Sequence, residues 1–264
     1  MTRNATIAGV ATAALLLATG CAAPASSPVS SPAPSHTPRT PPPVLVKTGC
    51  ADLVVLGLRG AGQAADKNFG AGQEILASVR AMSVELHRKS DTTVRLEGVP
   101  YRAEVAPTSA FHQGNLEDGV QRSKDRIAEL ARRCPDTKVA LVGFSQGAHV
   151  AHLIATTLSS AAAKRLVLIA MIADPIRNPQ DSIASWTYGK DARGPGKFGT
   201  GPTLPATLKD RAITFCAAGD EICNWPPGGY AGPLSMTHRH FYETSAHARS
   251  TGHQLARILR TAGL

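Results

Sequence analysis

The chain has 264 residues, a formal net charge of +9, and 43% hydrophobic against 18% charged side chains. This suits one globular domain with a sizeable core, preceded by a non-globular N-terminus. Residues 1–48 contain Arg3, Arg39 and Lys47 and no acid, which leaves +6 for the remainder. No basic run is interleaved with aromatic residues, so we interpret the charge as solubility and affinity for an anionic envelope surface, and expect no nucleic-acid partner.

Residues 1–20 have the pattern of an export signal. Arg3 supplies a positive start, and residues 7–18 form an apolar stretch too short to remain as a membrane-spanning helix. The sequence Leu-Ala-Thr-Gly-Cys at 17–21 resembles a bacterial lipobox, with Ala18 where leucine is usual. We therefore expect a lipoprotein signal peptide and lipidation of Cys21, which would anchor the chain to the cell membrane. The alternative is ordinary cleavage nearby, which leaves Cys21 free.

Residues 21–48 are rich in Pro, Ser and Thr and cannot build a core, so we expect a semi-rigid tether. The folded domain then occupies residues 49–264. In chain order, strands are expected at 53–58, 94–99, 138–142, 166–172 and 212–215. Helices are expected at 74–86, 148–158 and 254–264, and a further helix, whose apolar face includes Val120 and Ile127, is expected to end near Cys134. Residues 176–208 are rich in Gly and Pro and are expected to be irregular. Alternating strands and helices predict an α/β fold with a parallel sheet covered on both faces, whose active site lies at the carboxyl ends of the strands.

Cys50, Cys134, Cys216 and Cys223 remain after Cys21 is set aside. Four cysteines in an exported domain predict two disulfides, and three pairings are possible. A Cys216–Cys223 bond would close a short loop. A Cys50–Cys134 bond would join the first strand to the helix before residue 138 and stabilise the fold by roughly 2–4 kcal/mol.

The most informative motif is Gly-Phe-Ser-Gln-Gly at 143–147, between an expected strand and an expected helix. A serine at so tight a strand-to-helix turn is strained and exposes its hydroxyl, and the glycines avoid a Cβ collision with the neighbouring elements. The helix that follows supplies backbone N–H groups for a developing oxyanion. The motif predicts Ser145 as a nucleophile; the alternative is a glycine-rich turn that happens to contain serine.

A serine nucleophile needs a histidine base and an acid, in the chain order Ser, Asp/Glu, His for this kind of fold. Asp174 and Asp220 both follow expected strands. Asp174 precedes a proline and suits a turn cap, whereas Asp220 lies between Cys216 and Cys223, where a disulfide would fix it. We favour Asp220 as the acid.

The histidines that follow Asp220 are His238, His240, His247 and His253. The last two flank or begin the closing helix and are expected at the surface. His238 and His240 lie in the preceding loop, where a base can reach the strand ends, and the residues alone scarcely separate them.

Further motifs are spread over residues 49–264. They are Leu-Arg-Gly-Ala-Gly-Gln at 58–63, Arg-Cys-Pro-Asp-Thr at 133–137, Asp-Pro at 174–175, and Phe-Cys at 215–216 leading to Asp220 and Cys223. With the Ser145 elbow, this set resembles the cutinase family of serine esterases, particularly the cutinase-like proteins of mycobacteria and related actinobacteria. The resemblance implies a compact five-stranded α/β-hydrolase without a large lid, and the disulfides Cys50–Cys134 and Cys216–Cys223.

The resemblance also implies roles for single residues. Ser145 is the nucleophile, Asp220 the acid, and the backbone N–H of Gln146 one oxyanion donor. The family's His-x-x-aromatic pattern matches 238–241 and selects His238, whereas the spacing back from the final helix suits His240 slightly better. We take His238 as the base and keep His240 as the alternative. The family typically has serine where this chain has Ala61, so the second oxyanion donor keeps its N–H and lacks the hydroxyl.

We therefore expect a secreted or surface-anchored serine esterase that hydrolyses carboxylic esters (short or medium acyl esters, lipids or cutin-like polyesters) as a monomer without a cofactor. Acetyl removal from a polysaccharide is a variant, since acetylxylan esterases share this fold. The alternative is a catalytically weak envelope lipoprotein that binds lipid or a partner with the same scaffold. A zinc site could be formed by His149 and His152, or by His238 and His240, but no cysteine or carboxylate ligands accompany them at a familiar spacing, so we expect no metal. Trp186, Trp225 and Tyr230 either line an acyl groove or, by default, cover the edge of the core.

Overall fold

The computed structural model describes residues 45–264 apart from 107 and 160–162. The export signal, Cys21 and most of the tether lie outside the described residues. Within the described part of the chain, no helix combines the length and apolar character needed to cross a membrane.

Six parallel strands form one sheet in the order β2-β1-β3-β4-β6-β5. Their bounds are β1 Leu53–Leu58, β2 Val94–Gly98, β3 Lys138–Phe144, β4 Leu166–Ile172, β5 Ala184–Trp186 and β6 Ala212–Phe215. Alternate residues of the central strands contribute to opposite cores: Leu53 and Val55 of β1 belong to one apolar cluster, and Val54 and Leu56 to the other. Burial on both faces explains why these strands read as continuous apolar runs.

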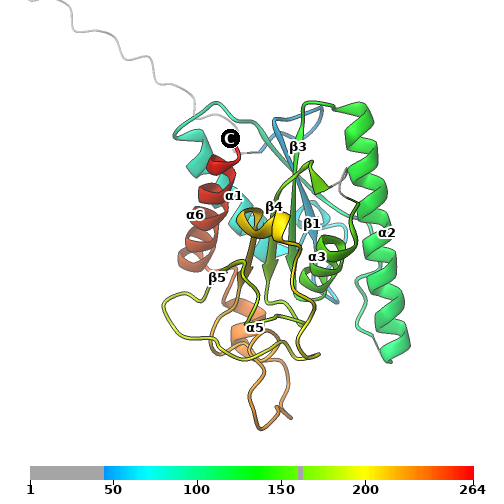
Figure 1. The fold of residues 1–264 in the computed structure, drawn as a ribbon, viewed down its shortest axis with the longest axis vertical. Coiled ribbons are helices and arrows are strands. Elements are labelled where there is room, and N and C mark those ends of the chain that lie inside the picture. The colour runs from blue at the N-terminus through cyan, green and yellow to red at the C-terminus, as the bar shows by residue number, and fades with distance from the viewer. Residues whose placement is uncertain (1–44, 107, 160–162) are drawn as a thin grey trace, which may run out of the picture. The chain divides into compact units, whose positions relative to one another are not determined.

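Helices cover both faces of the sheet (Figure 1). One pair is α1 Gln73–His87 with α6 Ser245–Thr261, and the other is α2 Ser109–Arg133 with α3 Gln146–Thr157. The short elements are the 3-10 turns η1 Asn68–Gly70 and η2 Ala206–Arg211 and the helix α5 Met236–His240. The α/β-hydrolase-like arrangement is as expected from the sequence.

Two details of the sequence prediction were wrong. The sheet has six strands instead of five, because residues 184–186, which we expected to be irregular, form a short edge strand against β6. Three residues are too few to show a hydrophobic period. The closing helix begins at Ser245 and not at residue 254, because its first half packs on α1 through small residues. A Cβ on Gly252 would lie 2.6 Å from the Cβ of Ala81, and such contacts leave no apolar stripe in the sequence.

Both disulfides pair as the resemblance implies. Cys50 is bonded to Cys134, with their Cα atoms 5.6 Å apart. Cys216 is bonded to Cys223, with their Cα atoms 5.8 Å apart, and this bond closes the loop that follows β6.

Candidate active site

Ser145 stands at the turn between β3 and α3. Its backbone has φ 53° and ψ −118°, a left-handed conformation that a non-glycine residue adopts only under constraint. The constraint is close backbone packing: a Cβ on Gly147 would lie 1.8 Å from the carbonyl oxygen of Leu58, and one on Gly143 would lie 2.2 Å from that of Gly147. The turn therefore requires both glycines and presents the half-buried serine at the carboxyl end of the sheet.

Asp220 lies in the disulfide-closed loop after β6 and is completely buried. Its Oδ1 accepts a hydrogen bond of 2.9 Å from the backbone N–H of Ile222, and its Oδ2 accepts one of 2.7 Å from the hydroxyl of Tyr242. A buried carboxylate is stable only when it is hydrogen-bonded in this way. The loop thus fixes both oxygens of the acid.

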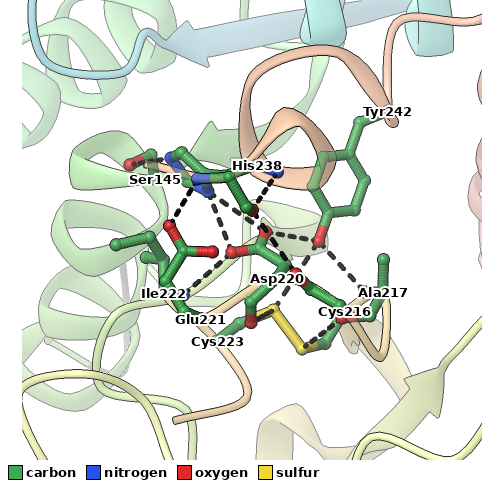
Figure 2. Close-up of polar contacts among 11 residues, drawn as sticks. Ser145, Cys216, Ala217, Asp220, Glu221, Ile222, Cys223, His238 and Tyr242 are labelled. Atoms are coloured by element: carbon green, nitrogen blue, oxygen red, sulfur yellow. Dashed lines mark hydrogen bonds and ion pairs between the residues drawn. A yellow bond between two sulfur atoms is a disulfide. The ribbon is translucent and has the colours of Figure 1, made fainter. Parts of the chain in front are cut away.

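His238 connects the serine with the acid (Figure 2). Its Nε2 is 3.1 Å from the Oγ of Ser145, and its Nδ1 is 3.0 and 3.1 Å from the two carboxylate oxygens of Asp220. The ring stacks on Phe144, with centroids 5.1 Å apart. Because an ionised carboxylate only accepts, Nδ1 carries the proton, and Nε2 is free to accept from the serine hydroxyl.

The alternative histidines lie elsewhere. His240 is exposed and its Nδ1 is 2.9 Å from Glu243. His247, in the last helix, stacks on Phe241, which directly follows α5, with ring centroids 3.5 Å apart, and His253 is exposed beside Glu85. The structure therefore brings together Ser145, Asp220 and His238 and leaves His240 pointing to a surface acid.

Tyr242 is a member of this cluster that the sequence analysis missed. Its hydroxyl donates to Asp220, accepts a 3.0 Å hydrogen bond from the N–H of Ala217, and is fully buried. Burial, and then the negative charge of Asp220, raises the pKa of Tyr242 well above its usual value, so the phenol remains a donor. The sequence signal that could have identified it is its position one helical turn after His238, the candidate base.

The loop at residues 59–63 and the first residue of α3 flank the serine hydroxyl. Ala61 and Gln146 line the same cavity as Ser145. Gln63 braces the loop, because its Oε1 accepts from the N–H of Gly60 at 2.7 Å and its Nε2 donates to Glu74 at 2.6 Å. Burial raises the pKa of Glu74.

A cavity of about 540 Å³, which we call the Ser145 cavity, opens at this point. Much of its wall is apolar, and it also includes the polar residues Thr108, Ser109, His112 and Lys197. The apolar part comes from Ala61, Val105, Ala106, Pro175, Phe198, Ile222 and Leu234. The cavity is large enough to hold an acyl chain or a compact alcohol beside the serine.

Asp174 and the two histidines considered for zinc have other partners. The carboxylate of Asp174 is 2.7 Å from the Nδ1 of His152 and does not contact His238. His149 packs against His112 and Phe198. Across the residues that the structure describes, no three His, Cys, Asp or Glu side chains are grouped so that they could hold a metal ion.

Trp186, Trp225 and Tyr230, the aromatic residues considered for an acyl groove, are not among the residues that line the Ser145 cavity. Trp186 lies in β5 and donates a 3.0 Å hydrogen bond to Ser250. Trp225 and Tyr230 border a neighbouring hollow of about 840 Å³, with their rings 6.5 Å apart.

Chemically, this arrangement combines a hydroxyl nucleophile, a base held in one tautomer, a buried acid and a helix N-terminus. These are the parts that acyl transfer through a covalent intermediate requires.

Comparison with known proteins finds similarity to esterases. A family model described as Cutinase matches residues 49–250. Cutinase CUT1 of Coprinopsis cinerea is 29% identical over 174 residues, which cover 66% of this chain and 71% of that protein. Carboxylesterase Culp1 of Mycobacterium bovis is 25% identical over 174 residues, covering 66% and 69%. The solved structure of a cutinase-like protein from Cryptococcus sp. superposes with a TM-score of 0.59 at 19% identity, covering 78% of this chain and 94% of that one, which supports the fold.

Proposed function

We propose that this chain, which belongs to the cutinase family and is a carboxylic ester hydrolase, cleaves its substrates through an acyl-enzyme formed on Ser145. The observation that carries the proposal is the unbroken line of hydrogen bonds from Asp220 through His238 to the serine hydroxyl.

The reaction proceeds in two stages. His238 takes the proton of the Ser145 hydroxyl at Nε2 as the oxygen attacks the ester carbonyl, and then gives that proton to the leaving alcohol. Water, activated by the same nitrogen, hydrolyses the acyl-enzyme and restores the serine. Asp220 keeps the proton on Nδ1 in place and stabilises the imidazolium that forms in each stage.

The oxyanion of each tetrahedral intermediate accepts hydrogen bonds from the backbone N–H groups of Gln146 and Ala61. Gln146 is the first residue of α3, so the positive end of the helix dipole supports its N–H. A serine at position 61 would add a hydroxyl donor. Its absence predicts an active enzyme with a lower kcat than a serine-bearing relative.

We propose short or medium acyl esters, including those of lipids or cutin-like polyesters, as substrates. The apolar wall and limited volume of the Ser145 cavity support this choice. Acetyl esters of polysaccharides remain a second candidate, because polar residues, among them Thr108 and Ser109, also line this cavity. We expect the enzyme to act as a monomer.

We further propose that the protein is exported and held at the membrane by a lipid on Cys21. The two disulfides support export, since such bonds persist in oxidising compartments. The lipobox-like residues 17–21 support the anchor. Mass spectrometry of the N-terminal peptide from envelope fractions tests this, and an unmodified Cys21 would exclude the anchor.

The first test is hydrolysis of p-nitrophenyl esters from acetate to palmitate by the wild type and by Ser145→Ala, with labelling by a fluorophosphonate. Loss of both activity and labelling in the variant is expected, and the chain-length profile identifies the acyl preference. His238→Ala should be as inactive as Ser145→Ala, whereas His240→Ala should retain most activity. A wild type that neither hydrolyses esters nor takes the label would favour the alternative, a lipid-binding or partner-binding scaffold weakened at Ala61.

A further inference from the structure

A second buried histidine–aspartate pair lies behind the Ser145 cavity. His152 is on α3, the helix that begins at Ser145, and Asp174 directly follows β4. The Nδ1 of His152 is 2.7 Å from the Oδ2 of Asp174, and the two side chains are 2% and 1% exposed. The reaction proposed above uses neither residue.

The contacts of both ring nitrogens define the protonation of His152. The Nε2 is 2.8 Å from the carbonyl oxygen of Pro202, which can only accept. An ionised Asp174 can also only accept, and its Oδ1 already receives a 3.0 Å hydrogen bond from the N–H of Ile176. Each nitrogen of the imidazole must therefore donate.

We propose that His152 is a buried imidazolium that carries a proton on both ring nitrogens, and that it is a positioning residue which fastens one wall of the Ser145 cavity to the helix of the nucleophile. It differs in this from His238, which in the proposed reaction must accept and then release a proton at Nε2. The two histidine–aspartate pairs thus have opposite requirements: the proposed catalytic histidine must transfer a proton in each turnover, and His152 must keep both of its protons.

The wall in question is residues 195–202, which we call the 195–202 segment. Lys197 and Phe198 of this segment line the Ser145 cavity. On one side the segment is hydrogen-bonded to the chain that follows Asp174, through Phe198 N–H to Pro175 O and Gly201 N–H to Ile176 O, each 2.8 Å.

On the other side the 195–202 segment touches α3 through His152. The hydrogen bond from Nε2 to Pro202 is one contact. The second is van der Waals packing over the ring, since a Cβ on Gly201 would lie only 3.0 Å from the Cε1 of His152. Deprotonation of His152 therefore removes a donor from either Asp174 or Pro202, and in both cases the support of the cavity wall is weakened.

The charged groups around His152 favour the cation. Burial by itself lowers its pKa, but the hydrogen bond and charge of Asp174, the Pro202 carbonyl and the charge of Asp181 raise it above the usual value in total. On its own helix, His149 is mainly neutral at pH 7, because burial lowers its pKa to about 4. Arg177, on the chain after β4, lies near Asp174 and donates to the carbonyls of residues 192 and 194.

The sign of the pH effect follows. Since the pKa of His152 is raised in the folded protein, its contribution to the stability of the fold is fully present below about pH 6.5, which is the pKa of histidine in an unfolded chain. It is lost as the pH rises through the folded pKa. KM for an ester should therefore rise on the alkaline side.

The decisive substitution is Asp174→Asn. The amide oxygen can still accept from the N–H of Ile176, and the amide nitrogen can donate to the unprotonated Nδ1 of a neutral His152. The Nε2–H bond to Pro202 also survives. This variant keeps the hydrogen bonds and removes the charge, so it separates the proposed protonation state from the fold.

The first measurement is NMR of 15N-histidine-labelled protein between pH 6 and 9.5, with His152 assigned by the loss of its signals in His152→Gln. Wild-type His152 should show two ring N–H groups at pH 7, and Asp174→Asn should show one. A single ring N–H in the wild type, including the case in which Asp174 holds the proton, overturns the proposal. This measurement needs no enzymatic activity and therefore does not depend on the proposed function.

The second measurement is the pH dependence of KM and kcat for p-nitrophenyl butyrate, which rests on the proposed esterase. In the wild type KM should rise roughly three- to fivefold between pH 7 and 9.5, and in Asp174→Asn this rise should disappear. His253→Gln, an exposed histidine, serves as the matched control and should follow the wild type. An unchanged pH dependence of KM in Asp174→Asn refutes the role in positioning, even where the imidazolium is found by NMR.

Discussion

Removing the hydroxyl of Tyr242 tests how the acid is held. Tyr242→Phe keeps the ring, which packs edge-on against Phe144, Tyr188 and Phe241. It deletes one oxygen that donates to Asp220, accepts from the N–H of Ala217 and makes a weak 3.6 Å contact with the Sγ of Cys223. Asp220 and Ala217 are both buried and would be left without this contact.

The expected cost can be estimated from the contacts with Asp220 and Ala217. A hydrogen bond to a charged group is worth about 1.5–3 kcal/mol, and a buried N–H without an acceptor costs about 1–3 kcal/mol. Because relaxation recovers part of this, we expect the free energy of unfolding to fall by about 2–4 kcal/mol. For a domain of this size that lowers Tm by roughly 5–15 °C.

The same hydroxyl predicts an alkaline effect. Burial and the charge of Asp220 raise the pKa of Tyr242 in the folded protein, whereas the unfolded chain ionises near pH 10. The contribution of Tyr242 to the free energy of unfolding is therefore fully present below about pH 10, and it is lost as the pH rises towards the pKa of Tyr242 in the folded protein. Tyr242→Phe should show a shallower loss of stability above pH 10 than the wild type.

Urea unfolding followed by circular dichroism at pH 7 and pH 10.5 measures both effects, and kcat for p-nitrophenyl butyrate reports on Asp220. We expect kcat to fall about tenfold, because one of the contacts that orient the acid is lost. Tyr230→Phe is the control, since its hydroxyl bonds to the carbonyl of Pro233 at an exposed site and should change stability by less than about 0.5 kcal/mol. A Tyr242→Phe protein as stable as this control would refute the reasoning.

Two further predictions concern the oxyanion site and the disulfides. Ala61→Ser should raise kcat by about tenfold at similar stability, because it supplies an oxyanion donor at an exposed position; an unchanged or lower kcat measured on p-nitrophenyl butyrate would contradict the assignment of this loop. The double serine variant of Cys50 and Cys134, which are 84 residues apart, should lose about 4 kcal/mol of stability, whereas that of Cys216 and Cys223, 7 apart, should lose about 2.5 kcal/mol. The loss of activity should have the opposite order: the variant of Cys216 and Cys223 should lose more activity, since only this loop contains the proposed acid. Equal activity of the two folded variants would contradict this prediction.

Much of the architecture could be predicted, because long buried strands and amphipathic helices leave strong periodic patterns. β1, β4 and β6 were expected within their observed bounds. The edge strand β5 and the first half of α6 were not, since three residues show no period and the contact of Gly252 with Ala81 depends on close approach instead of hydrophobicity.

In the candidate active site, too, some residues could be identified from a local sequence pattern and others depend on the fold. The glycines of the elbow have a local steric meaning, so Ser145 could be identified as the candidate nucleophile from a five-residue pattern. The choice between His238 and His240 could not be made locally, because residues two apart on a helical turn point in different directions and only the fold determines which one faces Asp220. Tyr242 was missed for a related reason: its partner is 22 residues away in the sequence, and a buried tyrosine has no distinctive pattern.

The three proposed catalytic residues differ in what fixes their positions. Ser145 is fixed where the backbones of β1 and α3 touch, and Asp220 is enclosed by a covalent ring of the chain. His238 instead lies on the five-residue helix α5, after the long loop from residue 224, and side-chain contacts orient it: the cap from Ser235, the stacking on Phe144 and the contact with Asp220. Insertions and substitutions in that loop can therefore adjust the angle of the base while the nucleophile and the acid stay in place, so evolution can retune reactivity here without rebuilding the sheet.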